Sequence, residues 1–153
     1  MKCATLAGLL WTVSVGAFAQ PASSVQVTGM VAHPGPVALA VLKQVTVTGS
    51  FHTMAGQESH HWTGPLLLDV VDRASMTDAP GKKTHMQHAI LARGSDGYAV
   101  AVAIGEIDSR GEGKQVIVAL EQDGKPLPTP RLVVPNDAAF ARGVRDLVGL
   151  EVR

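Results

Sequence analysis

Cysteine is almost absent from this sequence, since Cys3 is the only one in 153 residues. A disulfide framework needs paired cysteines, so the fold cannot depend on one. Cys3 precedes the N-terminal apolar run instead of following it, which argues against a lipid-anchored cysteine. If the N-terminal segment is cleaved as expected below, the chain also has no thiolate nucleophile and no thiolate metal ligand.

An excess of charge of one sign is missing too. The chain has 13 Lys and Arg against 13 Asp and Glu, and its formal net charge is zero. A near-neutral surface provides no electrostatic reason to bind nucleic acid or a membrane surface. We therefore expect no nucleic-acid partner and no direct membrane insertion after cleavage. A nucleophile elbow, a P-loop and a dinucleotide-binding glycine motif are absent as well.

The N-terminus has the layout of a secretory signal peptide. Lys2 precedes an apolar run over residues 4–17, and Ala17-Phe18-Ala19 forms a small-x-small cleavage site. The run is short for a permanent membrane helix. We expect residues 1–19 to be removed on export, leaving residues 20–153 as a single domain of ordinary size.

The remaining sequence predicts an α+β fold dominated by strands, arranged as a mixed sheet or barrel-like domain with short helices. Period-two alternation and apolar runs between turn residues predict strands. These lie over residues 25–31, 44–51, 88–92, 98–104, 116–121, 131–134 and 150–152. Residues 37–43 are interpreted as a short helix and residues 52–61 as a polar loop. The clearest helix is expected over residues 66–74, with Thr63 or Gly64 as its cap and Pro65 at its first position.

Several motifs in this order resemble the oxidoreductase molybdopterin-binding domain, which has the sulfite-oxidase-like fold. Trp62-Thr63-Gly64-Pro65-Leu66 resembles the family's W-x-G-x-x-L segment, and Ser95-Asp96-Gly97-Tyr98 resembles its A-D-G-Y turn. The run from Glu121 to Pro128 is similar to the D-G-x-P-L-P turn. Arg131–Pro135, Ala141–Arg145 and Leu150–Val152 are similar to the closing part of the family pattern.

The resemblance implies a cleft that accommodates a pterin, but it does not by itself imply catalysis. Catalytic members bind molybdenum through a protein thiolate, for which hydroxyl and imidazole are poor replacements. Residues 20–153 contain no cysteine, so this role has no candidate and the molybdenum cofactor is not expected. The family also contains small exported members that look like pterin-binding proteins, some coupled to a membrane receptor that controls cyclic-di-GMP turnover. The chain is more similar to those.

The resemblance and the few aromatic residues together indicate a ligand site. A pterin is a flat heteroaromatic ring that needs a stacking face and polar groups at its edge. Arginines can bind an anionic group through a bidentate fork. The candidate ligand-binding residues are Trp62, Ser95, Asp96, Tyr98, Arg131, Phe140, Arg142 and Arg145.

Each candidate has a structural alternative. Trp62 either stacks on a ligand or fills the core. Asp96 either accepts from the amino-pyrimidine edge of a pterin or forms its turn, and Tyr98 packs across its hairpin or meets the ligand. Phe140 stands where the family usually has glycine, so it either narrows the cleft or adds a second stacking face.

The histidines are a competing signal. All six lie after residue 19, as His33, His52, His60, His61, His85 and His88. Imidazoles suit zinc, copper or nickel, but adjacent residues such as His60 and His61 point to opposite sides of an extended chain. We predict no metal site.

Three functions remain open at this stage. The leading one is an exported, non-catalytic pterin-binding protein in the periplasm that signals occupancy to a membrane partner. The second is a molybdenum-cofactor-dependent oxidoreductase, or a subunit of one. The third is an adaptor domain that kept the fold and lost the ligand.

Overall fold

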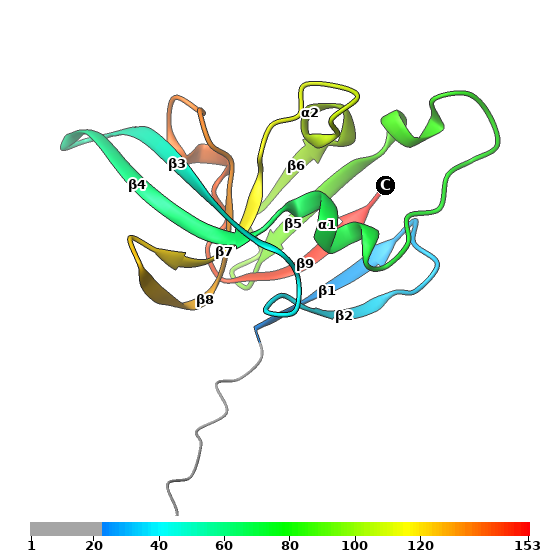
Figure 1. The fold of residues 1–153 in the computed structure, drawn as a ribbon, viewed down its shortest axis with the longest axis horizontal. Helices are drawn as coiled ribbons and strands as arrows, with labels where there is room; N and C mark the ends of the chain where they lie inside the picture. The colour runs from blue at the N-terminus through cyan, green and yellow to red at the C-terminus, as the bar shows by residue number, and fades with distance from the viewer. Residues whose placement is uncertain (1–22) are drawn as a thin grey trace, which may run out of the picture.

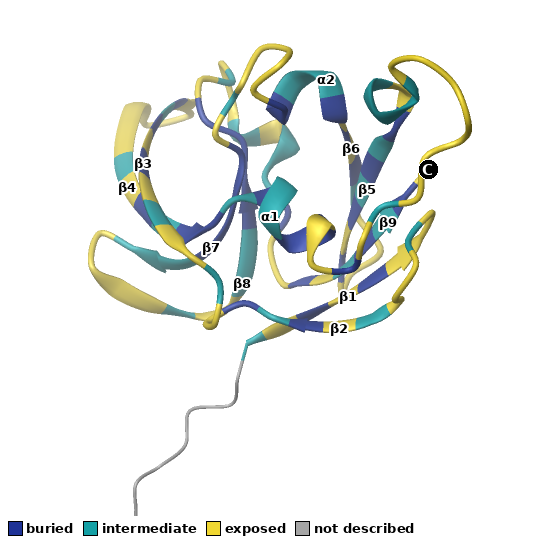
Figure 2. Cartoon of the chain, turned by 45° about the vertical axis from the view of Figure 1, so that its right-hand side comes forward, coloured by how far each residue is buried: buried dark blue, intermediate teal, exposed yellow. Residues whose placement is uncertain are grey.

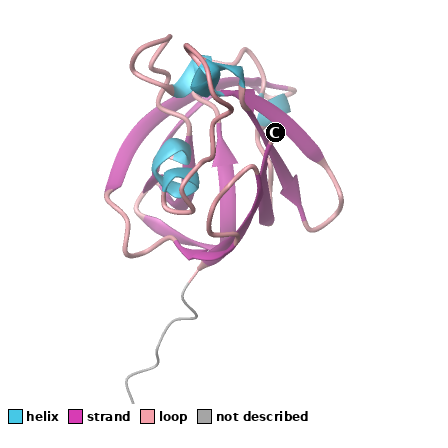
Figure 3. Cartoon of the chain, turned by 90° about the vertical axis from the view of Figure 1, so that its right-hand side faces the viewer, coloured by secondary structure: helices cyan, strands magenta, loops and turns pink. Residues whose placement is uncertain are grey.

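The computed structural model describes residues 23–153, and the expected signal peptide over residues 1–19 lies outside this range. Strands dominate the described chain and the helices are short (Figure 3). In chain order the elements are β1 (Ser24–Gly29), β2 (Gly35–Ala38), β3 (Gln44–Thr53), β4 (Gly56–Pro65), α1 (Leu67–Asp72), the 3-10 turn η1 (Thr84–Gln87), β5 (Ala89–Gly94), β6 (Ala99–Ala103), α2 (Ile104–Ile107), β7 (Ile117–Gln122), β8 (Lys125–Val133), the 3-10 turn η2 (Phe140–Arg142) and β9 (Leu147–Val152). The expected strand-dominated α+β fold is confirmed.

The strands form two sheets instead of one sheet or barrel (Figure 1). The five-stranded sheet has the order β2-β1-β9-β5-β6, and the four-stranded sheet has the order β3-β4-β7-β8. The first sheet is mixed, because the C-terminal strand β9 lies parallel to β1 and antiparallel to β5. The chain therefore closes by inserting its last strand between its first strand and the β5–β6 hairpin.

Apolar side chains cover both faces of the four-stranded sheet. In β7, Val118 faces the main core, which also contains α1 and the inner face of the five-stranded sheet. Its neighbours Ile117 and Ala119 belong to a second cluster with Trp62 and Phe51. Successive strand residues point to opposite faces, so burial of all three requires a covered sheet on both sides. Figure 2 shows buried stretches in strands of both sheets. The second cluster forms the floor of the candidate site.

The helix expected over residues 66–74 is confirmed in its position but not in its cap. Leu67, Val70 and Val71 are buried at the i, i+3, i+4 spacing of one helix face. The helix has Leu66 at its N-cap and no side-chain cap, because residues 63–65 are the end of β4. The proposed capping roles of Thr63 and Gly64, and of Pro65 at the first position, are therefore wrong.

Two other expectations are wrong in the same part of the chain. The helix predicted over residues 37–43 does not form. Val37 and Ala38 end β2, in which Val37 pairs with Val25 of β1, and residues 39–43 form a turn. The loop predicted over residues 52–61 is the outer half of the long β3–β4 hairpin (Figure 1). Its tip carries polar side chains on both faces and mostly exposed residues (Figure 2), so it lacks the apolar alternation that marks a half-buried strand.

Gly64 allows the backbones of β4 and β7 to lie close together. A Cβ atom at this position would lie 2.1 Å from the carbonyl oxygen of Val118. We expect Gly64→Ala to lower the free energy of unfolding by about 1–3 kcal/mol, because the two backbones must move apart. Chemical denaturation measures this. Gly105→Ala is the matched control, since its added Cβ meets no atom within 4 Å; equal effects of the two substitutions would contradict this account.

Candidate ligand-binding site

A pocket of about 320 Å³ opens over the second apolar cluster. Its walls combine aromatic rings, two arginines and a small polar edge. The lining residues are Phe51, Thr53, Glu58, His60, Trp62, Gln122, Arg131, Phe140 and Arg145. Four of the eight predicted ligand-binding residues are among them, namely Trp62, Arg131, Phe140 and Arg145.

The β3–β4 hairpin positions one wall of this pocket. Glu58, His60 and Trp62 occupy alternate positions of β4 and therefore share one face of the sheet. They lie opposite Phe51, Gly49 and Val47 of β3, in that order. A Cβ atom at Gly49 would lie 2.6 Å from the Phe51 ring, so the glycine leaves the space into which that ring folds.

Three aromatic rings pack together at the base of the pocket. The Phe140 ring stacks on Trp62, with 5.8 Å between centroids and 27° between planes. Phe140 also meets Phe51 edge-on at 4.6 Å. Trp62 is only 2% exposed, and no hydrogen-bond partner is found for its buried indole N–H within the described range. Trp62 is thus a core residue and a pocket wall at once, and Phe140 narrows the cleft by covering part of its face.

Arg131 lies against the same rings. Its guanidinium carbon is 5.2 Å from the Trp62 centroid and 4.9 Å from the Phe140 centroid, which is a cation–π arrangement. Burial, followed by repulsion from Arg145, lowers the pKa of Arg131. In residues 23–153 no side chain forms an ion pair or hydrogen bond with Arg131 or Arg145, in contrast to Arg142. The pocket therefore presents two neighbouring cations that form no ion pair within the described range. The nearby carboxylate of Asp146 lines an adjacent pocket with both arginines and partly offsets the lowering of the Arg131 pKa.

His60 adds a titratable group at the polar edge. Its Nδ1–H donates to Asp123 at 2.8 Å, and its Nε2–H donates to Glu58 at 3.4 Å. The hydrogen bond with Asp123 raises the pKa of His60 above its usual 6.5, although burial opposes the shift. An imidazole with carboxylates at both nitrogens favours the charged form.

The pH dependence of this pair has a definite sign. Because the pKa of His60 is raised in the fold, its stabilising contribution is complete below pH 6.5 and is lost as pH rises through the raised value. We expect the His60 ring to titrate above 6.5 by NMR and to titrate lower in Asp123→Asn, which retains the backbone contact with His61. The same midpoint in both proteins would show that Asp123 does not hold the proton on His60.

The remaining predicted residues lie elsewhere. Asp96 accepts a hydrogen bond from the Tyr98 N–H at 2.9 Å, which is the turn-forming arrangement. The half-exposed Tyr98 donates its hydroxyl to the carbonyl of Ala141. Ser95 lines a different pocket together with residues of β1 and β9.

Arg142 is occupied by two acidic partners. It contacts Asp137 at 2.7 Å and Glu106 at 3.0 Å, so it ties η2 to α2. The pKa of Arg142 is raised, first by its hydrogen bonds with Asp137. The structure therefore does not bring Arg142, Ser95, Asp96 and Tyr98 into the pocket around Trp62.

Sequence reasoning missed most of the polar edge of the pocket. Glu58 and His60 were assigned to a loop, and Gln122 ends β7 beside the turn motif. If residues 56–65 are recognised as a strand, His60 and Glu58 are expected on the same face as Trp62, because every second residue of a strand shares a face.

His85 and His88 lie in a separate network with acidic side chains. His88 is buried and hydrogen-bonds to Asp78 at 2.9 Å, while His85 hydrogen-bonds to Asp108 at 3.0 Å. Arg110 holds the pKa of Asp108 far below its usual range. Within residues 23–153, no group of three or more histidine, cysteine or acidic side chains has the arrangement of a metal site.

Comparison with known proteins adds no relative. No family model matches the chain, and no curated protein is significantly similar to it. Over the described range, no helix has the length and apolar character needed to cross a membrane.

Proposed function

We propose that this chain is an exported, non-catalytic protein of the sulfite-oxidase-like type that binds a pterin or a related flat, anionic heteroaromatic. The observation that carries the proposal is Arg131. Its guanidinium is half-buried against two aromatic rings, beside Arg145, and forms no ion pair within residues 23–153, while Asp146 acts on it only from beyond ion-pair distance. Desolvating a charge is unfavourable unless a partner compensates. A ligand carboxylate or phosphate provides that partner.

The pocket has the size and the polar edge that a pterin requires. Its volume of about 320 Å³ falls in the range of small-molecule sites. The amino-pyrimidine edge of a pterin presents two adjacent donors, which a carboxylate can accept. Glu58, in place of Asp96, is the carboxylate at the polar edge of the pocket. Its oxygens accept from Thr53 and His60, and each has a further lone pair for the pterin. Gln122 supplies a further donor and acceptor beside it.

The donor set does not fit the molybdenum centre of catalytic family members. That centre needs a thiolate, and none of the lining residues is cysteine. Glu58 and His60 offer oxygen and nitrogen, and both are already engaged with one another or with Asp123. The second function, a molybdenum-dependent oxidoreductase, therefore has less support than ligand binding.

One observation favours the adaptor function. Phe140 stacks on Trp62 and meets Phe51 edge-on, so part of the aromatic wall is already covered by protein. A flat ligand can stack on Trp62 only if Phe140 moves, or it can lie on the outer side of Phe140 and Arg131. An adaptor would leave this aromatic cluster undisturbed and would bind no pterin.

Export and signalling complete the proposal. The segment over residues 1–19 supports cleavage and release into the periplasm, and the family resemblance supports a membrane receptor as partner. In this scheme the bound pterin changes the surface around η2, because Phe140 belongs to both the pocket and that turn.

Calorimetric titration of the purified protein tests the proposal. We compare a pterin carrying a carboxylate, a neutral reduced pterin and inorganic phosphate. Saturable binding of the carboxylated pterin, tighter than that of the other two, supports a site for a flat anion. Absence of heat with every pterin favours the adaptor. Stoichiometric molybdenum, together with activity that depends on it, would instead establish the oxidoreductase.

A further inference from the structure

The outer edge of β3 has backbone groups that no strand uses. β3 and β4 are joined by a two-residue turn, with Thr53 opposite Gly56. In such a hairpin the closing pair, Thr53 and Gly56, is hydrogen-bonded. Counting back from Thr53, the backbone N–H and C=O groups of every second residue therefore bond to β4, and those of the residues between them face away from β4. The N–H of His52 shows this directly, because it donates to Ala138 at 2.9 Å. By the same alternation, the N–H and C=O groups of Thr46 and Thr48 face away from β4.

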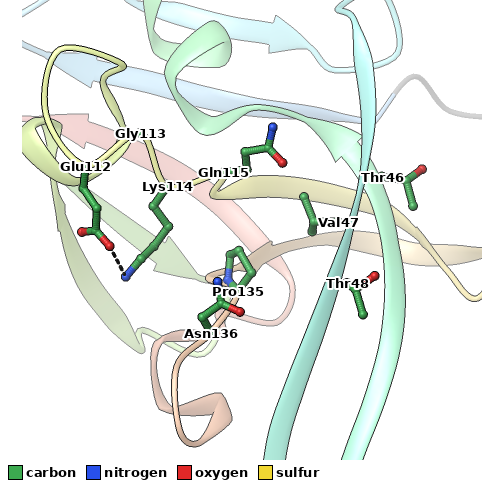
Figure 4. Close-up of a pocket in the computed structure, with 9 residues that line it drawn as sticks. All are labelled: Thr46, Val47, Thr48, Glu112, Gly113, Lys114, Gln115, Pro135 and Asn136. Atoms are coloured by element: carbon green, nitrogen blue, oxygen red, sulfur yellow. Dashed lines mark ion pairs between the residues drawn. The ribbon is translucent and has the colours of Figure 1, made fainter.

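These groups face a groove. A pocket of about 440 Å³ lies between Thr46–Thr48 on one side and residues 112–115 with Pro135 and Asn136 on the other (Figure 4). The far wall is fixed by backbone hydrogen bonds to α2, from Glu112 to Gly105 at 3.0 Å and from Lys114 to Glu106 at 2.7 Å. Outside the β3–β4 ladder, no backbone group of residues 23–153 bonds to Thr46 or Thr48.

The two edge strands of the four-stranded sheet, β3 and β8, differ in composition. The edge strand β8 carries Pro126, Pro128 and Pro130 at alternate positions, so three of its residues have no backbone N–H to offer to another strand. Proline and charged residues are common protections against edge-to-edge pairing. β3 spans ten residues without a proline, a lysine, an arginine or a carboxylate. Its edge is therefore free to accept another strand at Thr46 and Thr48, whereas His52 is already bonded to Ala138.

We propose that this groove binds an extended, uncharged polar segment of a partner polypeptide, which adds to β3 as a further strand. The charges of the groove fit such a segment, because Lys114 and Glu112 lie 3.6 Å apart and compensate each other (Figure 4). The other polar lining side chains are neutral. The wall of residues 112–115 and Pro135 stands beside this edge, so a single strand meets less of it than the whole sheet that a second copy of the chain would bring.

Amide hydrogen exchange by NMR tests this with a defined probe. The probe is a mixture of uncharged heptapeptides made from Thr, Ser, Asn, Gln and Val. We expect the Thr46 and Thr48 amides to exchange at least about tenfold more slowly when the peptides are present. Thr48→Pro removes one of these donors and is expected to weaken peptide binding at least about tenfold. Thr48→Val retains the donor and is expected to bind as the parent protein does.

Peptides that are N-methylated at alternate positions provide a second test that needs no protein variant. They are expected to lose the effect, because they cannot form both rows of backbone hydrogen bonds. The proposal is overturned if no heptapeptide slows exchange at Thr46 and Thr48, or if self-association of the protein alone protects these amides. Pterin titration of Thr48→Pro is independent of this result, since Thr48 does not line the pocket around Trp62.

Discussion

Replacing Trp62 with alanine is expected to lower the free energy of unfolding by about 3–5 kcal/mol, the range for large aromatic truncations in cores. Trp62 is 2% exposed and belongs to the apolar cluster with Val47, Ile117 and Val133. Its removal leaves a cavity between the four-stranded sheet and Phe140. Urea denaturation of the parent protein and the variant measures the difference.

Tyr98→Ala is the matched aromatic control. Tyr98 is 48% exposed and its hydroxyl donates a hydrogen bond to the Ala141 carbonyl, so we expect a loss of about 1 kcal/mol. If the two truncations cost the same, Trp62 does not have the core role that its burial assigns. Because Trp62→Ala affects stability so strongly, loss of ligand binding in this variant alone does not locate the ligand.

Arg131→Gln is expected to weaken binding of a carboxylated pterin by about 10- to 100-fold. A hydrogen bond to a charged group contributes about 1.5–3 kcal/mol, and each factor of ten corresponds to about 1.4 kcal/mol. Glutamine keeps part of the side-chain length but cannot supply the positive charge or the planar fork. Parallel calorimetric titrations of the parent protein and the variant measure the change in affinity.

Arg73→Gln controls for the loss of a positive charge in general. Arg73 follows α1, is exposed and does not line the pocket. Its substitution is expected to leave the affinity within about twofold, and a neutral pterin is expected to be affected less by Arg131→Gln than a carboxylated one. Equal losses for Arg73→Gln and Arg131→Gln would indicate that only the overall charge matters.

The parts of the fold that could be predicted from sequence are those encoded locally. The Ser95-Asp96-Gly97 turn lies between two apolar runs, and the β5–β6 hairpin forms there. The helix at α1 follows from the spacing of Leu67, Val70 and Val71. The β3–β4 hairpin could not be predicted in full, because its outer half is exposed on both faces and has no periodic apolar signal.

The candidate site could be predicted only in part, for a related reason. Trp62, Arg131 and Phe140 come from β4, β8 and η2, and the motifs that carry the family resemblance identify them one at a time. Whether they meet depends on the pairing of β4 with β7 and of β7 with β8. Arg142 has the same local signals as Arg131, but Asp137 and Glu106 neutralise it, and only the tertiary structure shows that.

The most direct test of the account uses the fluorescence of Trp62, the only tryptophan after residue 19. Protein that has been exported, and whose cleavage is checked by mass spectrometry, is titrated with a carboxylated pterin. We expect a saturable change in Trp62 emission at micromolar ligand or below, with its midpoint about 10- to 100-fold higher in Arg131→Gln. A change that rises linearly without saturation, or one that is identical in Arg131→Gln, would contradict a ligand site between Trp62, Phe140 and Arg131.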